Sequence, residues 1–144
     1  MFGAPGHGYV YLIYGYYFCM NAVCRPQGVA EAVLIRAVEA GVGEEFMRQR
    51  RPVVATRDLT NGPGKLCLAL DIDRRLDGVD LCDAKSPLFI ARNSAVDEFL
   101  TERGPIVTAT RIGLTKAVDL PLRFYLQGST FVSERRSARR SDKP

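Results

Sequence analysis

Five of the six tyrosines of this 144-residue chain fall within nine positions, residues 9–17. Side chains alternate between the two faces of a strand, and here both faces would be apolar or aromatic. Such residues favour strands, and Gly15 offers a point of reversal into residues 17–23. We therefore predict a β-hairpin with Tyr14 near its tip. The Tyr14 ring could be buried against a neighbour or could project as a wedge.

Two helices are predicted by their end signals. Residues 43–51 have acids in the first turn and bases in the last, as the helix dipole favours, and Pro52 follows them. Residues 61–70 begin with Asn-Gly-Pro. Asn61 or Gly62 can cap the N-terminus of a helix, and Pro63 fits its first turn. Further strands are expected at residues 29–38, 88–92, 106–114 and 122–127.

The order of these elements predicts an α+β fold: a single domain with a curved, mainly antiparallel β-sheet, forming a partly open barrel or roll, and a few packed helices. We expect this domain to span residues 1–132. Residues 133–144 are rich in serine and arginine without apolar periodicity, which predicts a basic, disordered tail.

The charge of the chain does not by itself predict DNA binding. The net charge is +4, but residues 133–144 hold five basic and two acidic side chains, so residues 1–132 carry 15 basic against 14 acidic ones. The body is thus nearly neutral, and any phosphate contact has to come from a local patch.

The four cysteines form no C-x-x-C pair, and His7 is the one histidine, so no metal site is expected. No secretory signal is visible at the N-terminus. The apolar run 9–24 is shorter than the ~20 residues that a membrane-spanning helix needs. We expect an intracellular protein with reduced, mostly buried thiols, no membrane segment and no cofactor.

Several blocks of the sequence resemble one family. They include Tyr-Val-Tyr-Leu-Ile-Tyr-Gly-Tyr-Tyr-Phe-Cys-Met-Asn, Asn-Gly-Pro-Gly-Lys-Leu-Cys-Leu-Ala-Leu and Pro-Leu-Arg-Phe-Tyr, and the full set covers residues 1–2, 5–6, 9–21, 31–39, 47–48, 61–70, 111–113, 121–125 and 131–133. In this content and order the chain resembles the alkyladenine (3-methyladenine) DNA glycosylases of base-excision repair. The resemblance implies hydrolytic removal of alkylated or deaminated purines from double-stranded DNA by a monomer, leaving an abasic site.

The resemblance also implies roles for residues that handle the base. Tyr14 matches the intercalating tyrosine, whose ring fills the gap left when a base is extruded. Tyr11 matches a pocket tyrosine that stacks on the damaged purine. Asn21 matches the residue credited with rejecting guanine, whose exocyclic amine an amide can oppose. Without the resemblance, each would be a core or turn residue.

Further roles concern the attacking water and the DNA backbone. Arg36 and the backbone of Ile112 match the groups that position the water. The resemblance implies that Lys65 contacts the DNA backbone, and Arg74 is a further candidate for a phosphate contact, although both would also suit a solvated surface.

The chain departs from the family pattern at its catalytic acid. The family carries this acid in a Glu-Ala-Tyr motif, together with a pocket histidine, ahead of the first matched block. Neither occurs here, and His7 lies in a Pro-Gly-His-Gly turn. We expect a fragment or a misplaced start, with an exposed edge that lowers solubility. Glu31 and Glu39 flank Arg36, but both are expected to be outward or terminal and unable to replace the acid.

Two alternatives follow from this departure. The chain could be a non-catalytic module that binds damaged DNA, retaining the wedge tyrosine and Asn21. It could also be an inactive gene fragment that does not fold stably.

Overall fold

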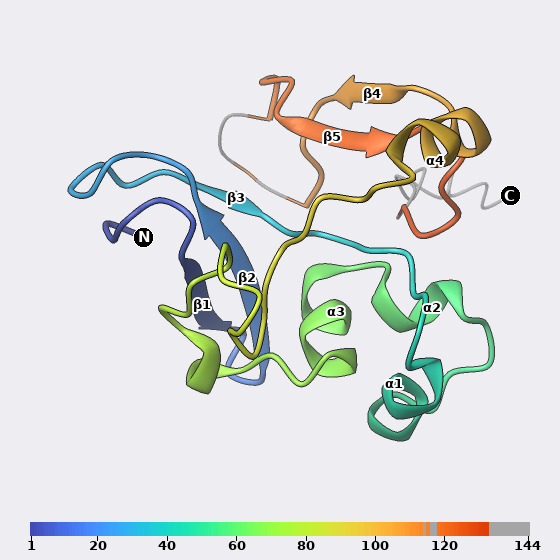
Figure 1. Cartoon of the computed structure of the whole chain (residues 1–144), viewed down its shortest axis with the longest axis horizontal. Helices are drawn as coiled ribbons and strands as arrows, with labels where there is room; N and C mark the ends of the chain where they lie inside the picture. The colour runs from blue at the N-terminus through green and yellow to red at the C-terminus, as the bar shows by residue number, and fades with distance from the viewer. Residues whose placement is uncertain (114, 116–117, 133–144) are drawn as a thin grey trace, which may run out of the picture.

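The computed structural model describes residues 1–113, 115 and 118–132, and the predicted tail lies outside them. It confirms the α+β class, with two open antiparallel sheets in place of one continuous sheet (Figure 1). The larger sheet has the order β1–β2–β3, formed by Gly8–Ile13, Tyr17–Val23 and Ala32–Leu34. The smaller sheet pairs β4 (Ile106–Ala109) with β5 (Arg123–Leu126).

The predicted hairpin is confirmed as β1 and β2. Ile13 pairs with Tyr17, so the chain reverses over three residues. Tyr14 and Gly15 both have positive φ, 54° and 78°, and the amide of Tyr16 donates to the carbonyl oxygen of Ile13. Glycine adopts this backbone without steric cost, whereas a tyrosine does so only under local constraint.

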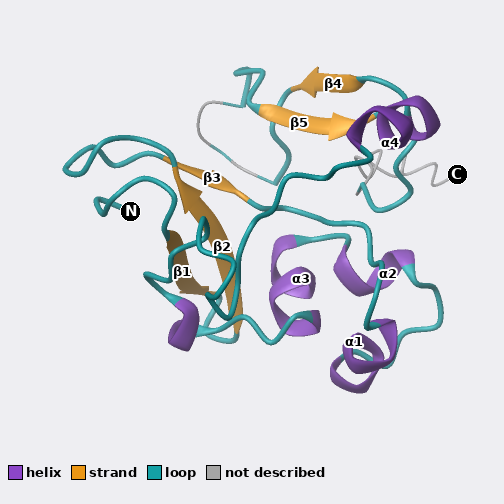
Figure 2. Ribbon diagram, viewed as in Figure 1, coloured by secondary structure: helices purple, strands orange, loops and turns teal. Residues whose placement is uncertain are grey.

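In the described part of the chain, five helical segments connect and cover the sheets: α1 (Glu44–Arg50), α2 (Arg57–Thr60), α3 (Pro63–Ala69), the 3₁₀ turn η1 (Arg74–Leu76) and α4 (Val96–Arg103) (Figure 2). The two predicted helices are confirmed as α1 and α3. The sequence analysis did not predict α2, η1 or α4.

The core lies between the hairpin and α3. One cluster contains Val10 and Met20 from the hairpin together with Cys67, Ile72 and Leu81. A second cluster joins α1, α2 and α3 through Met47, Leu59 and Ala69. Burial of such side chains is the main favourable contribution to folding, at about 25 cal/mol per Å² of apolar surface.

Three of the predicted strands differ from the structure. The strand expected at 29–38 is reduced to β3, because residues 26–31 form turns and the chain leaves the sheet after Leu34. Residues 88–92 form no strand; only the amide of Ile90 bonds across, to the carbonyl oxygen of Leu81. The strand expected at 106–114 ends at Ala109, and residue 114 is not among the described residues.

All four cysteines are free, but only Cys19 and Cys67 are buried. The expectation of mostly buried thiols is therefore wrong for Cys24 and Cys82, which are exposed because they lie in surface turns beyond β2 and η1. Among the described residues, no helix combines the length and the apolar character needed to span a membrane.

Candidate functional site

One face of the hairpin carries two of the predicted site residues. In β1, the rings of Tyr9 and Tyr11 stack with centroids 5.3 Å apart. Their cross-strand partners in β2 are Asn21 and Cys19 respectively, so all four side chains share a face. The hairpin thus places the predicted stacking ring and the predicted selectivity amide side by side.

Asn21 is buried, and its orientation is fixed by the neighbouring strand. Its Nδ2 atom donates to the carbonyl oxygen of Tyr9 at 3.1 Å. The side chain is 7% exposed. A buried amide held by such a bond presents a fixed polar edge, which is what discrimination between purines requires.

Cys19, which the sequence analysis did not single out as a site residue, lies against Tyr11. Burial raises the pKa of the Tyr11 hydroxyl, and contact with the Cys19 thiol raises it further. Burial likewise raises the pKa of Cys19, so both groups are neutral at physiological pH. The spacing of the hairpin about Gly15 could have identified this pair, because it sets Cys19 opposite Tyr11.

Arg36 lies two residues beyond β3 and is half-buried. Its Nε atom is buried and has no hydrogen-bond partner among the described residues. Burial lowers the pKa of Arg36, and the like charge of Arg123 in β5 lowers it further. An isolated guanidinium in this position favours an anion or a polar ligand beside it.

Arg36 belongs to the wall of a groove of about 720 Å³ between residues 34–41 and the unit formed by α4 and β5. On this groove Arg103 of α4 pairs with Glu39, with 3.0 Å between Nε and Oε2. Glu39, expected to be outward or terminal, lies beyond the end of β3, and the ion pair holds its side chain at 21% exposure. Glu31 is exposed, as expected, beside Arg25.

Ile112 follows β4 by three residues and is partly buried. The last residue of β4, Ala109, pairs with Arg123, which acts electrostatically on Arg36. Three residues of chain reach at most about 10 Å, so Ile112 lies within about 10 Å of Ala109.

Tyr14 projects from the hairpin tip and is 75% exposed. The neighbouring Tyr16 is also exposed but its ring lies 4.5 Å from that of Tyr17. Of the two geometries left open by the sequence, burial and projection, the structure shows projection.

Lys65 and Arg74 lie on different elements, α3 and η1. The Lys65 Nζ atom donates to the side-chain oxygen of Asn61 at 2.7 Å, which holds the ammonium close to the helix start. Arg74 is exposed and makes no ion pair with a described residue. Among the described residues, neither side chain forms a hydrogen bond or ion pair with the hairpin face.

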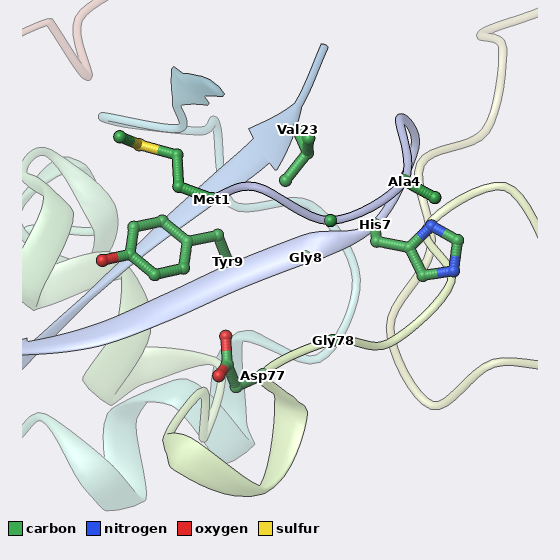
Figure 3. A pocket seen from close by; sticks show the side chains of 9 residues that line it. Met1, Ala4, His7, Gly8, Tyr9, Val23, Asp77 and Gly78 are labelled. Carbon is green, nitrogen blue, oxygen red and sulfur yellow. The ribbon is translucent and has the colours of Figure 1, made fainter. Parts of the chain in front are cut away.

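A smaller pocket of about 250 Å³ lies at the opposite end of β1 from Tyr14. It is lined by residues that include Met1, His7, Tyr9 and Asp77 (Figure 3). The Asp77 carboxylate accepts a hydrogen bond from the amide of Val10 at 2.9 Å, so it stabilises the edge of β1. None of the predicted site residues lines this pocket.

No group of three or more potential metal ligands occurs among residues 1–113, 115 and 118–132. The candidate site consists of a hairpin face with tyrosine, cysteine and asparagine side chains, an exposed ring at the hairpin tip, and a half-buried arginine beyond β3.

Comparisons with known proteins agree on one family. The sequence model described as "Methylpurine-DNA glycosylase (MPG)" matches residues 1–130. A proposed 3-methyladenine DNA glycosylase of Methanoculleus marisnigri is 48% identical over 135 residues, covering 94% of this chain and 68% of the relative.

Two further relatives carry the same name. That of Desulfitobacterium hafniense is 44% identical, over 92% of this chain and 67% of its own length. That of Mesorhizobium japonicum is 47% identical, over 95% of this chain and 62% of its own length. The chain thus spans about two thirds of the length of the curated relatives that it matches.

Proposed function

Because this chain belongs to the methylpurine-DNA glycosylase family, we propose that it takes part in base-excision repair, as a glycosylase that extrudes and hydrolytically removes alkylated or deaminated purines from double-stranded DNA. The product would be an abasic site. We further propose that it acts inside the cell and as a monomer.

One observation carries the proposal beyond family membership: a single hairpin holds an exposed ring at its tip and a stacking ring beside a buried amide on its face. A glycosidic bond inside a duplex is inaccessible until its nucleotide leaves the stack, at a cost of a few kcal/mol. Tyr14, exposed at the hairpin tip, is our candidate to enter the resulting gap, as aromatic wedges do.

The extruded purine would then meet the hairpin face. Stacking of a base on an aromatic ring contributes about 1–3 kcal/mol, and Tyr11 offers its ring together with that of Tyr9. Asn21, held by the Tyr9 carbonyl group, would test the edge of the base. A substrate group that leaves this amide unmatched is disfavoured.

Hydrolysis needs a water that is positioned and deprotonated while positive charge develops on the sugar. Arg36 and the Ile112 backbone are our candidates for positioning it. No described carboxylate pairs with Arg36, and Glu39 is engaged by Arg103, so we assign the general base to none of the described residues.

Two measurements test the proposal. The first compares equilibrium binding of the chain to a short duplex with one hypoxanthine and to its undamaged counterpart. Tighter binding to the damaged duplex is expected, with the preference lost in Tyr14→Ala. Equal affinity of the unsubstituted chain for both duplexes would contradict it.

The second measurement is single-turnover release of hypoxanthine with protein in excess. The alternative is a module that binds the lesion without cleaving. Release that is lost in Arg36→Ala supports the glycosylase; selective binding without release supports the module.

A further inference from the structure

Three polar side chains at the junction of α2 and α3 form a continuous hydrogen-bonded chain. The Nδ2 atom of Asn61 donates to the Asp58 carboxylate at 2.9 Å, and the Lys65 ammonium donates to Oδ1 of Asn61 at 2.7 Å. All three residues are partly buried. An ammonium can only donate and an ionised carboxylate can only accept, so one orientation of the amide satisfies both neighbours. The chain of bonds therefore fixes Asn61, and Asn61 fixes the Lys65 ammonium.

The Asn61 amide keeps two opposite charges apart. In the described part of the chain, neither Lys65 nor Asp58 takes part in an ion pair, so no carboxylate there neutralises the ammonium. The ammonium has three N–H donors, and one of them meets Asn61. Its aliphatic stem lies over Gly62, where an added β-carbon would stand 3.8 Å from the Lys65 Cδ atom. The cation is thus ordered and still charged before any ligand binds.

This ordered cation belongs to a helix that packs beside the exposed tyrosines of the hairpin tip. Figure 1 shows α3 alongside β2, and the two elements are in contact. Gly64, the residue before Lys65, lies against the ring of Tyr17. Tyr14 and Tyr16, in the turn before Tyr17, are exposed. A duplex that receives an aromatic wedge carries phosphates on both sides of the opened step, and an ammonium on the adjoining element suits such a phosphate.

Resting on the proposed function, which supplies duplex DNA as the ligand, we propose that Asn61 is a positioning residue for DNA binding. It orients the Lys65 ammonium for a backbone phosphate and keeps it from pairing with Asp58. Ordering a long side chain in advance removes an entropic cost that the complex would otherwise bear. Keeping the ammonium free of a carboxylate retains the charge whose counterions DNA binding releases.

The test exchanges the two partners of the amide chain. The double variant Asp58→Asn, Asn61→Asp has the composition and net charge of the unsubstituted chain, and both hydrogen bonds can still form. Its carboxylate, however, now faces the Lys65 ammonium. Binding to a short undamaged duplex is measured by fluorescence anisotropy over a series of salt concentrations.

The exchanged variant should bind about fivefold more weakly at low salt, because the ammonium is neutralised by its new neighbour. The slope of log K against log salt should become shallower by about 0.9, as for the loss of one phosphate contact with B-DNA. Lys65→Met should give the same slope. The matched control exchanges the exposed residues Asn93 and Asp97, beside and within α4, and should leave affinity and slope unchanged. An aspartate at position 93 can still accept from the amide of Ala95.

A double-mutant cycle separates positioning from a general effect on stability. Asn61→Ala should weaken binding about threefold in the unsubstituted chain, because the lysine is no longer ordered in advance. The same substitution should have no effect in the Lys65→Met background, because Asn61 acts through Lys65. Equal weakening in both backgrounds would assign Asn61 a structural role only and overturn the proposal. This cycle decides the question even if the exchanged variant unfolds.

The remaining outcomes distinguish this inference from the proposed function. Salt-dependent binding with unchanged affinity and slope in the exchanged variant would overturn the positioning role of Asn61 and leave the glycosylase proposal intact. The expected changes in affinity and slope, without release of hypoxanthine from a damaged duplex, would support the positioning role and contradict base removal alone. No salt-dependent binding of the unsubstituted chain to any duplex would overturn both.

Discussion

The backbone of Gly64 lies so close to the ring of Tyr17 that a β-carbon on Gly64 would stand 2.9 Å from the Tyr17 Cγ atom. Gly64 is in the first turn of α3, and Tyr17 begins β2 beside the hairpin tip. The contact therefore fixes the start of α3 against the base of the loop that carries Tyr14. It is one reason why this helix needs glycine at that point.

We predict that Gly64→Ala destabilises the chain by about 1–3 kcal/mol, because the added methyl group forces the ring or the helix to shift. The measurement is the free energy of unfolding in urea. Gly41→Ala is the control: Gly41 has open space around its Cα atom and a φ outside the positive range, so a change within about 0.5 kcal/mol is expected. Equal losses in both variants would refute the packing argument.

Tyr14→Ala should reduce the preference for damaged over intact duplex at least tenfold while leaving stability nearly unchanged. The side chain is 75% exposed, so its removal costs little burial. Fluorescence anisotropy with paired duplexes measures the preference. Tyr16→Ala, which removes a ring at 70% exposure from the same loop, should have a smaller effect. Equal effects would mean that general apolar character, and not the wedge position, determines binding.

Local patterns predicted the parts of the fold that are set by neighbouring residues. Gly15 and the alternating aromatic run were sufficient for β1 and β2, and the helix-end signals were sufficient for α1 and α3. Residues 29–38 did not form the long predicted strand. Ala32–Leu34 pair with Asn21–Val23, and the amide of Ile35 still donates to the carbonyl oxygen of Met20, but the chain then leaves β2, although β2 continues to Tyr17.

Asn21→Ala should lower stability by about 1–3 kcal/mol and weaken discrimination between damaged and normal purines. The substitution removes the hydrogen bond to the Tyr9 carbonyl oxygen and leaves a small void in a buried site. The urea midpoint measures the loss. Asn93→Ala, which removes an exposed side-chain bond to the amide of Ala95, should cost less. A larger loss at Asn93 would show that burial of Asn21 is unimportant.

The candidate site was only partly predictable, and for a physical reason. Resemblance to the family predicted Tyr11, Asn21 and Arg36, and strand geometry explains why the first two share a face. The ion pair of Glu39 with Arg103 joins residues 64 positions apart, and no local pattern encodes it. The place of Arg123 beside Arg36 likewise depends on how the two sheets meet. The roles of Tyr11, Asn21 and Arg36 in base removal stay predictions.

Cys67 should be among the last thiols to react with iodoacetamide in the folded chain. Burial, followed by the nearby Cys19, raises the pKa of Cys67 to about 11, so its reactive thiolate is scarce at pH 8. Mass spectrometry after short labelling should show Cys24 and Cys82 modified first, because both are exposed. In urea all four should react at similar rates. Early modification of Cys67 in the folded state would contradict this burial.

Protonation of Glu44 should contribute to the loss of stability of this chain in acid. The Arg48 guanidinium and then the Thr56 hydroxyl donate hydrogen bonds to this carboxylate and lower the pKa of Glu44. A depressed folded-state pKa stabilises the fold above the unfolded value of about 4.3, and this contribution fades as pH falls through the folded value.

Glu44→Gln should therefore lower Tm at pH 7 but flatten the decline of Tm between about pH 5 and pH 3, since the group that titrates there is gone. Differential scanning calorimetry across this range measures the slope. Glu45→Gln alters the adjacent, exposed carboxylate in the same helical turn and should keep the original slope. Identical slopes for all three proteins would show that the bonds from Arg48 and Thr56 do not link folding to the protonation of Glu44.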